Sequence, residues 1–289
     1  MRFFYLVRTI VSSDEIPVKR VGNAAAFVPE FLEGIARSRA RALLGIADEL
    51  PFRGEDLWTG YEFSWLNEVG KPVAAGLRVR VPCTSTNLVE SKSMKLYLNG
   101  FAETRFESRG DVLEILENDL AEAFGATPVV EVLEPDGLGA TSRMLGESLD
   151  ALRVVVNDYE RNPELLTLAE GLEAGRGGLP AGRVTAAWHT DLFRSICPIT
   201  GQPDWASMMV EYTGLPIAPE GLLRYLVSYR RHMAFHEDTV ERIFVDIMQR
   251  CRPDELTVYG RFLRRGGLDI NPFRSTHAAT APEMRLVRQ

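Results

Sequence analysis

Cysteine and histidine are scarce in this sequence of 289 residues, which contains three cysteines and four histidines. Cys83, Cys197 and Cys251 are odd in number and lack CxxC spacing, so we expect neither a disulfide framework nor a cysteine-rich zinc site. The histidines form no metal-ligand motif beyond a weak pair, His232 and His236, and neither HExxH nor GxSxG occurs. The sequence therefore predicts no bound metal, and its free thiols are typical of a reducing cytosol.

Long apolar runs and an excess of positive charge are also missing. No segment approaches the roughly 20 apolar residues that a membrane helix needs. Arg8 and the charged stretch "SSDEIPVKR" interrupt the apolar N-terminus, which argues against a signal peptide. The net charge of -7 argues against general binding of nucleic acid. We expect a cytoplasmic globular protein with no membrane partner and no direct nucleic-acid partner.

A helical pattern occurs twice with one spacing of 128 residues. Apolar residues at i, i+3, i+4 and i+7 predict a helix in "ESKSMKLYLNGF", and the same face returns in "EGLLRYLVSYR". "DVLEILENDL" and "TVERIFVDIM" match in the same way, as do the strand-like "TPVVEVLE" and "ELTVYGRFL". We interpret this as an α+β fold with a duplicated module, in which antiparallel strands carry helices on one face. The alternative is a chance likeness between amphipathic helices.

The repeat divides the chain into four parts. We expect an N-terminal extension at 1–45, an N-terminal module at 46–140, a connecting segment with a glycine-rich loop at 141–185, and a C-terminal module at 186–289. Within the connecting region, neither "GLGATS" nor "GRGGLPAG" completes a dinucleotide or phosphate-loop motif. A nucleotide, if one binds, must therefore be held in another way.

Cys197 is the first candidate for chemistry. It lies in "SICPITGQPDW", a stretch rich in turn formers, so its thiol can face a cleft. A thiolate is a strong nucleophile, but an ordinary cysteine with a pKa of about 8.5 needs an acid–base partner. Asp204 is the nearby candidate. A small buried thiol beside a solvated aspartate is the alternative, and the residues alone favour it.

Two helix starts carry polar side chains with competing interpretations. Asn87 and Glu90 have the spacing of a helix N-cap and its reciprocal acid. Glu90 also lies along the apolar face, where the N–H groups of a bound heterocycle would satisfy it. His236 and Glu237 begin a later helix, where acids are favoured by the helix dipole. His236 with Phe235 can also meet a flat ligand.

A basic cluster stands out in this acidic protein. Arg261, Arg264, Arg265 and Arg274 occur within "YGRFLRRGGLDINPFR". Glycines beside arginines let the backbone approach phosphate while guanidinium groups hold its oxygens. A strand edge guarded by arginine is the alternative. One of two lysines near Glu90, Lys92 or Lys95, can likewise meet a phosphate.

Taken together, "ESKSMKLY", "CPITGQPDW", "FHEDTVERIF" and "RRGGLDINPFR" resemble the long, two-module form of the QueF family of 7-cyano-7-deazaguanine reductases. The resemblance runs from about Leu50 to Gln289. It implies tandem tunnelling-fold modules of the ββααββ type. It also implies NADPH-dependent reduction of a deazaguanine nitrile in queuosine biosynthesis, by a homodimer. Four-electron reduction of a nitrile needs two NADPH molecules in succession.

The resemblance also implies residue roles. Cys197 is the nucleophile that forms a covalent thioimide, and Asp204 donates the proton to the nitrile nitrogen. Arg265 and Lys92 would meet the 2′-phosphate of the cofactor. The implied substrate contacts are Val89, Glu90, Ser91, His236 and Glu237. The implied NADPH contacts are Ser91, Lys92, Arg265 and Gly266.

Two other functions remain open. A thiol-dependent nitrile or amide hydrolase would also use Cys197 with an acid, but it would release ammonia and need no NADPH. A non-catalytic purine-binding oligomer would need Glu90, His236 and Glu237 but not the thiol. The basic cluster favours the reductase over both.

Overall fold

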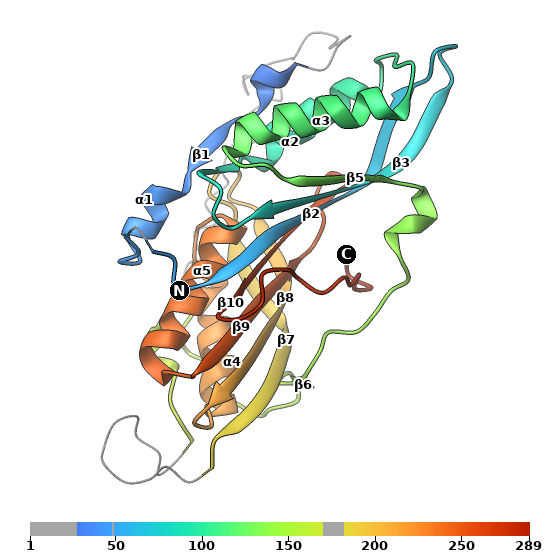
Figure 1. Ribbon diagram of the computed structural model, residues 1–289. Coiled ribbons are helices and arrows are strands. Elements are labelled where there is room, and N and C mark those ends of the chain that lie inside the picture. Colours follow the sequence, from blue (N-terminus) through green and yellow to red (C-terminus); the bar gives the residue numbers. More distant parts are fainter. Residues whose placement is uncertain (1–27, 48, 170–181) are drawn as a thin grey trace, which may run out of the picture.

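The computed structural model describes residues 28–47, 49–169 and 182–289. Eight strands form one sheet (Figure 1). Neighbouring strands in the described residues are antiparallel, except that the last strand of the sheet is parallel to its neighbour. In the order of the sheet, the strands are β5 (Val129–Leu133), β3 (Pro72–Pro82), β2 (Arg53–Leu66), β10 (Leu268–Ser275), β9 (Glu255–Phe262), β8 (Pro203–Gly214), β7 (Val184–Ile196) and β6 (Glu147–Ser148).

The two halves of the chain repeat one pattern, as the 128-residue spacing predicts. A hairpin of two strands, two helices and a return strand gives β2, β3, α2 (Ser91–Phe101), α3 (Arg109–Phe124) and β5. The C-terminal half gives β7, β8, α4 (Pro219–Ser228), α5 (His236–Cys251) and β9. Each hairpin also contains a register shift at the matching place, Gly60/Phe63 in one and Thr190/Phe193 in the other.

The halves differ by one strand. The C-terminal half continues into β10, whereas after β5 the chain forms the 3-10 helix η2 (Pro135–Leu138) and then the two-residue β6, which pairs with β7 of the other half and not with the strands of its own. The ββααββ pattern expected of both modules is therefore found only in the second. β10 pairs with β2 over eight residue positions, so the extra strand joins the two halves into one sheet. The α+β class and the antiparallel sheet are confirmed.

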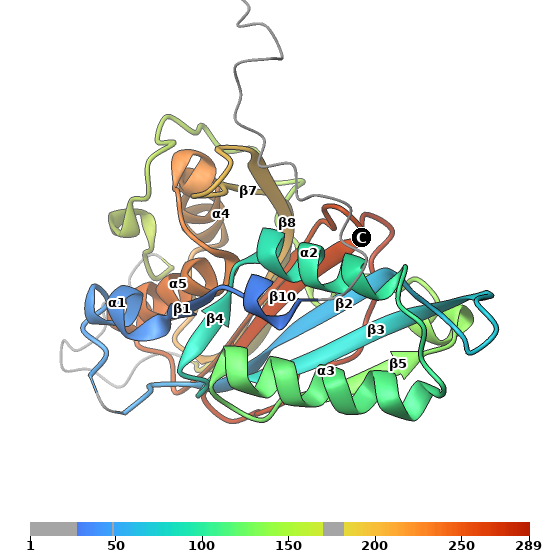
Figure 2. The same ribbon diagram turned by 90° about the horizontal axis from the view of Figure 1, so that it is seen from above.

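The helices of both halves cover the same face of the sheet (Figure 2). Ile270 of β10 belongs to the apolar cluster under α2 and α3. Arg274 lies four residues further along the same strand, so it points to the same face, and there it contacts Glu241 of α5. The expectation of helices on one face is thus confirmed, and the starts of α2 and α5 lie over neighbouring parts of the sheet.

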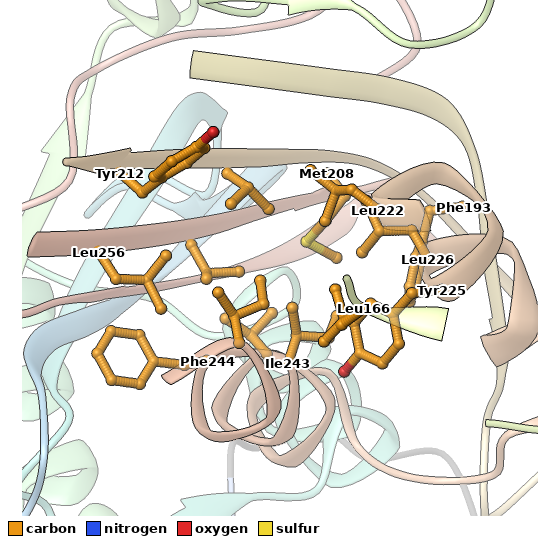
Figure 3. Packing of buried hydrophobic residues seen from close by; sticks show 14 of the residues in the cluster. Leu166, Phe193, Met208, Tyr212, Leu222, Tyr225, Leu226, Ile243, Phe244 and Leu256 are labelled. Atoms are coloured by element: carbon orange, nitrogen blue, oxygen red, sulfur yellow. The ribbon is translucent and has the colours of Figure 1, made fainter. Parts of the chain in front are cut away.

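The core of the C-terminal half shows why these helices form. Figure 3 shows Met208 of β8, Leu222 of α4 and Ile243 of α5 in one buried cluster. The buried positions of α5 follow helical spacing, as at Val240, Ile243, Phe244 and Ile247. Each large apolar side chain contributes roughly 1.5–3 kcal/mol when removed from water. The repeated faces read from the sequence are therefore the faces that fix both helix pairs to the sheet.

Six smaller elements complete the described chain. In the N-terminal segment, the 3-10 helix η1 (Pro29–Phe31) precedes β1 (Gly34–Ala36) and α1 (Arg37–Ala42). β1 pairs with β4 (Asn87–Val89), immediately before α2. The remaining 3-10 helices are η3 (Pro163–Leu165) and η4 (Tyr229–Arg231). The glycine-rich loop expected in the connecting segment lies, apart from its last residues, outside the described residues.

Candidate active site

A cavity lies where the two halves meet. The N-terminal half contributes the start of α2, and the C-terminal half contributes the β7–β8 loop, the start of α5 and the turn between β9 and β10. The floor is apolar, with Val89, Leu268 and Ile270 among its residues. The polar lining consists of Glu90, Ser91, Lys95, Cys197, Asp204, His236, Glu237 and Arg265.

The predicted site residues converge on this cavity from segments far apart in the sequence. Eight of them line it: Val89, Glu90, Ser91, Cys197, Asp204, His236, Glu237 and Arg265. Lys92 and Gly266 do not line it, and both are exposed. Gly266 borders the lysine that does, because a Cβ atom on Gly266 would lie 3.3 Å from Cδ of Lys95. Of the two lysines considered, the cavity therefore contains Lys95, whereas the resemblance implied Lys92.

Cys197 follows β7 in a tight loop. Its backbone N–H donates to the carbonyl of Gln202 at 2.9 Å, and its own carbonyl accepts from Gly201 N at 3.0 Å. Gly201 has a φ of 67°, which glycine adopts without steric cost. Burial raises the pKa of the Cys197 thiol, but hydrogen bonds from Thr200 and from the backbone of Ile199 outweigh burial, so the pKa is lowered. The loop thus favours the thiolate.

The three cysteines differ in the direction in which the pKa of the thiol is shifted. Burial raises the pKa of Cys251 to about 11, and burial also raises the pKa of Cys83. Cys197 is only partly buried, whereas the other two are buried. Because the thiolate is the reactive species, the turn-rich loop around Cys197 marks the reactive thiol. The structural alternative considered for Cys197, an inert buried thiol, is disfavoured.

Asp204 is the second residue of β8 and is 3% exposed. Its Oδ1 accepts from Nη1 of Arg265 at 2.7 Å, and its Oδ2 lies 3.4 Å from Nε2 of His236. Burial raises the pKa of Asp204, but the hydrogen bonds and charges of His236 and Arg265 outweigh it and lower the pKa. Asp204 is therefore a carboxylate in the cavity, not a solvated surface acid, and it can accept a proton.

Arg265 contacts residues of the β7–β8 hairpin. Besides Asp204, its guanidinium donates to Oγ1 of Thr200 at 3.1 Å and to Oε1 of Gln202. Lys95 lies nearby, and burial together with the charge of Arg265 lowers the pKa of its ammonium group. Thr200 and Gln202 were missed at the sequence level, although both belong to the turn-rich stretch that contains Cys197.

Glu90 is the N-cap of α2, and the cap expected at Asn87 is wrong. Oε2 of Glu90 accepts from Ser93 N at 2.8 Å. Asn87 lies three residues earlier in β4, where its side chain donates to the carbonyl of Ala123 at 3.1 Å. The strand pairing of β4 with β1 delays the helix start by several residues. Glu90 thus caps the helix with one oxygen and borders the cavity.

His236 and Glu237 begin α5. The ring of His236 stacks on Phe262, with centroids 3.8 Å apart and planes at 4°, so its aromatic partner is on β9. Glu237 is 2% exposed. The pKa of Glu237 is raised to about 8, mainly by burial and to a lesser extent by the charge of Asp56. The charge of Arg37 opposes this rise.

The basic cluster does not form one phosphate-binding surface. Arg274 is 0% exposed and pairs with Asp56 at 2.8 Å and Glu241 at 2.9 Å. Arg261 is also buried, and it donates to Gln289 and Tyr259. Both strands are internal, so the alternative of a guarded edge is wrong as well. Only two members of the cluster, Arg264 and Arg265, remain partly or fully accessible.

Two further findings concern the described residues as a group. Among them, no set of three or more histidine, cysteine, aspartate or glutamate side chains is arranged to hold a metal ion. None of their helices combines the length and apolar character needed to cross a bilayer.

Comparison with known proteins identifies the family. Residues 24–132 match the family model described as nitrile reductase, 7-cyano-7-deazaguanine-reductase N-term, and residues 203–281 match the model described as QueF-like protein. The NADPH-dependent 7-cyano-7-deazaguanine reductase of Desulfotalea psychrophila is 46% identical over 94% of this chain and 96% of that protein. The proteins of the same name from Bordetella avium and Burkholderia vietnamiensis are 45% identical over 92% of this chain and 93% and 95% of their own length.

The chain belongs to the 7-cyano-7-deazaguanine reductase family. Its resemblance to that family is confirmed, and the match begins at residue 24, well before Leu50. The names of these relatives also bear out the prediction of an NADPH-dependent nitrile oxidoreductase. Among solved structures, the chain is similar over 36% of its length to the archaeosine synthase QueF-Like in the apo form, with 20% identity and a TM-score of 0.28.

Proposed function

We propose that this chain reduces the nitrile of 7-cyano-7-deazaguanine to an aminomethyl group with NADPH, as a step of queuosine biosynthesis. One observation carries the proposal: Cys197, whose pKa is lowered, and Asp204, a buried carboxylate, line one cavity. A nitrile carbon is electrophilic, so a thiolate beside a proton acceptor is the pair that covalent addition needs. The curated relatives carry the name of this activity.

The deazaguanine is held between the two helix starts. Carboxylates accept with good geometry from adjacent N–H groups such as those on a guanine-like edge. Glu90 comes from one half and Glu237 from the other, with His236 beside the second. The backbone at Val89 and Ser91 completes the proposed substrate contacts. Apolar floor residues such as Leu268 exclude water from the flat ring.

Covalent addition follows from the positions of the two catalytic groups. Asp204 accepts the proton of the Cys197 thiol. The sulfur then forms a bond to the nitrile carbon, one π bond of the nitrile breaks, and Asp204 returns the proton to the nitrile nitrogen. The product is a thioimide with unchanged oxidation state, and no other reactant is consumed. Arg265 and His236 hold Asp204 in place for both transfers.

The residues at the mouth of the cavity fit a nicotinamide nucleotide. Lys95 in the cavity lining and the exposed Lys92, which follows Ser91, supply cationic groups for phosphate, and Gly266 with Gly267 adopts positive φ values of 62° and 80°, which leaves backbone accessible. Ser91 lies in the cavity lining next to them. When bound, NADPH supplies a hydride, and two molecules in succession complete the four-electron reduction. Arg265 reaches the same mouth, but its contacts with Asp204 and Thr200 favour a role on the catalytic side.

The setting of the reaction is also part of the proposal. We place the enzyme in the cytoplasm, because a nucleophilic thiol must stay reduced and the described cysteines are free. We propose a homodimer, as the family's tunnelling assembly implies, and no direct nucleic-acid partner, in keeping with the net charge of -7.

The proposal is tested by following NADPH absorbance after addition of 7-cyano-7-deazaguanine to the native chain and to Cys197→Ala. Four-electron chemistry requires about two NADPH per nitrile, and we expect the variant to oxidise none. Cys251→Ala is the matched control, because Cys251 is a buried thiol remote from the cavity lining. Ammonia release without NADPH oxidation would instead support a hydrolase, and binding without turnover would support a silent purine binder.

A further inference from the structure

A second pocket lies between α4, β7 and the connecting segment, and it shares no lining residue with the candidate active site. Residues 152–159 form one wall and run beside α4 (Figure 2). Nε of Arg224 on α4 donates to the carbonyl of Val155 at 3.2 Å, and the N–H of Arg231 donates to the carbonyl of Tyr159 at 3.1 Å. The pocket has a volume of about 570 Å³, which is in the usual range for small-molecule sites.

The lining of this pocket combines apolar walls with cationic groups and contains no acidic residue. Successive side chains of an extended segment point to opposite sides, so alternate residues of the wall face the pocket while Val155 is 74% exposed. The whole chain has 40 acidic and 33 basic residues, so the charge of the lining is opposite to that of the protein. The apolar residues are Leu152, Val154, Val156, Leu192, Leu223 and Val227, and the polar ones are Tyr159, Arg194, Arg230 and Arg231.

Two of these arginines lie against the same aromatic ring. The guanidinium carbons of Arg194 and Arg230 are 5.7 and 5.5 Å from the ring centroid of Trp205, and Nη1 of Arg194 donates to the carbonyl of Arg230 at 2.6 Å. Within the described parts of the chain, neither side chain forms an ion pair with a carboxylate. The third, Arg231, lies 3.8 Å from Glu160, and both of these side chains are exposed. Positive charges held together without a counter-charge attract an anion.

We propose that this pocket binds an organic anion, with a flat or apolar body between the walls and a phosphate, sulfonate or carboxylate group on Arg194 and Arg230. Guanidinium groups bind such oxygens through paired N–H donors, and the walls contribute by removing apolar ligand surface from water. An inorganic anion would leave the walls unused, and a neutral apolar compound would leave the two cations without a counter-charge. The site is separate from the proposed reductase chemistry and does not depend on it.

The test titrates the native chain with anilinonaphthalene sulfonate, an aromatic sulfonate whose fluorescence rises in apolar surroundings. We expect saturable binding that weakens about tenfold or more in Arg230→Gln, because hydrogen bonds to charged groups are the stronger ones. Leu192→Ser removes a wall residue that is already 44% exposed and should weaken binding a few-fold. Arg153→Gln is the matched control and should bind as the native chain does, since Arg153 is an exposed arginine of the same segment outside the lining.

The variants are chosen so that the fold survives and the dye can be located. Arg230→Gln is preferred to Arg194→Gln, because Arg194 also donates to a backbone carbonyl, and near-UV circular dichroism confirms that each variant is folded. Equal dye binding by the native chain and Arg230→Gln would overturn the proposal. Loss of binding in Lys95→Gln would overturn it as well, since the dye would then occupy the candidate active site.

Competition against the bound dye then identifies the body of the ligand. Displacement by phenyl phosphate supports an aromatic ligand, and displacement by octanoate supports an alkyl one. Inorganic phosphate at the same concentration should displace little dye, because it cannot fill the apolar walls. If inorganic phosphate displaced the dye as well as phenyl phosphate does, the pocket would hold an anion alone and the proposed class of ligand would be wrong.

Discussion

The two halves of the molecule share their helices and sheet but give different helix starts to the cavity. The N-terminal half contributes the start of α2, with Glu90 as its N-cap. The residue 128 positions later is Ala218, which precedes α4 and makes no side-chain cap. The C-terminal half contributes the start of α5, with His236 and Glu237. Their counterpart in α3 is Ser108, which forms a capping box with Asp111.

This difference shows which parts of a repeated fold can diverge between its two copies. The apolar faces are under the same packing constraint in both halves, so they stay alike. Helix starts are less constrained, because capping can come from several side chains or from none. In each half, one helix start therefore lines the cavity, at α2 and at α5. The other helix start in each half, at α3 and at α4, contributes no residue to the cavity lining.

The hairpin loops show the same contrast. In the β2–β3 loop, Oδ1 of Asn67 accepts from the N–H groups of Val69 and Lys71 at 3.2 and 2.9 Å, which closes an ordinary turn. In the β7–β8 loop, donors from Ile199 and Thr200 are directed at the sulfur of Cys197 instead. The loop that contains the proposed nucleophile therefore directs hydrogen bonds at its thiol.

The largest effect among variants that keep the nucleophile is expected at Asp204. Asp204→Asn leaves a side chain of the same size that can no longer accept the thiol proton. We expect kcat to fall about 10²- to 10⁴-fold, which is the usual range for general acid–base groups. The measurement is steady-state NADPH oxidation, together with intact-mass detection of the covalent adduct. A kcat within a few-fold of native would mean that Asp204 only shapes the loop.

A smaller effect, on binding, is expected at Glu90. Glu90→Gln keeps a side-chain oxygen that can accept from Ser93 N, so the helix cap and the melting temperature should change little. It removes the negative charge that faces the ligand, and hydrogen bonds to charged groups contribute about 1.5–3 kcal/mol. We expect KM for the nitrile to rise roughly 10- to 100-fold. An unchanged KM would make Glu90 a cap and nothing more.

The sequence predicts the repeated faces well and the polar details less well, for a physical reason. The faces of α2 to α5 follow from local periodicity, so Met94 and Leu222 lie where the 128-residue spacing places them. The cap at Glu90 depends on pairing between β1 and β4, which are more than fifty residues apart. The role of Arg274 was missed, and Lys95 could not be chosen over Lys92, because each is decided by residues from distant segments, such as Asp56 on β2 and Arg265 beyond β9.

The smallest effect, and the one that separates the two kinds of helix start, is expected at Ser108. Its Oγ accepts from Asp111 N at 3.2 Å, and the Asp111 carboxylate accepts from Ser108 N at 2.9 Å. Ser108→Ala removes half of this box and should lower the free energy of unfolding by about 1 kcal/mol, or roughly 2–4 °C in melting temperature. Because Ser108 lies outside the cavity lining, KM and kcat should stay at native values. Thermal unfolding and NADPH oxidation of the same preparation measure both. If Ser108→Ala raised KM as Glu90→Gln is expected to do, the start of α3 would also belong to the site. The distinction between helix starts that bind the ligand and helix starts that only cap a helix would then be wrong.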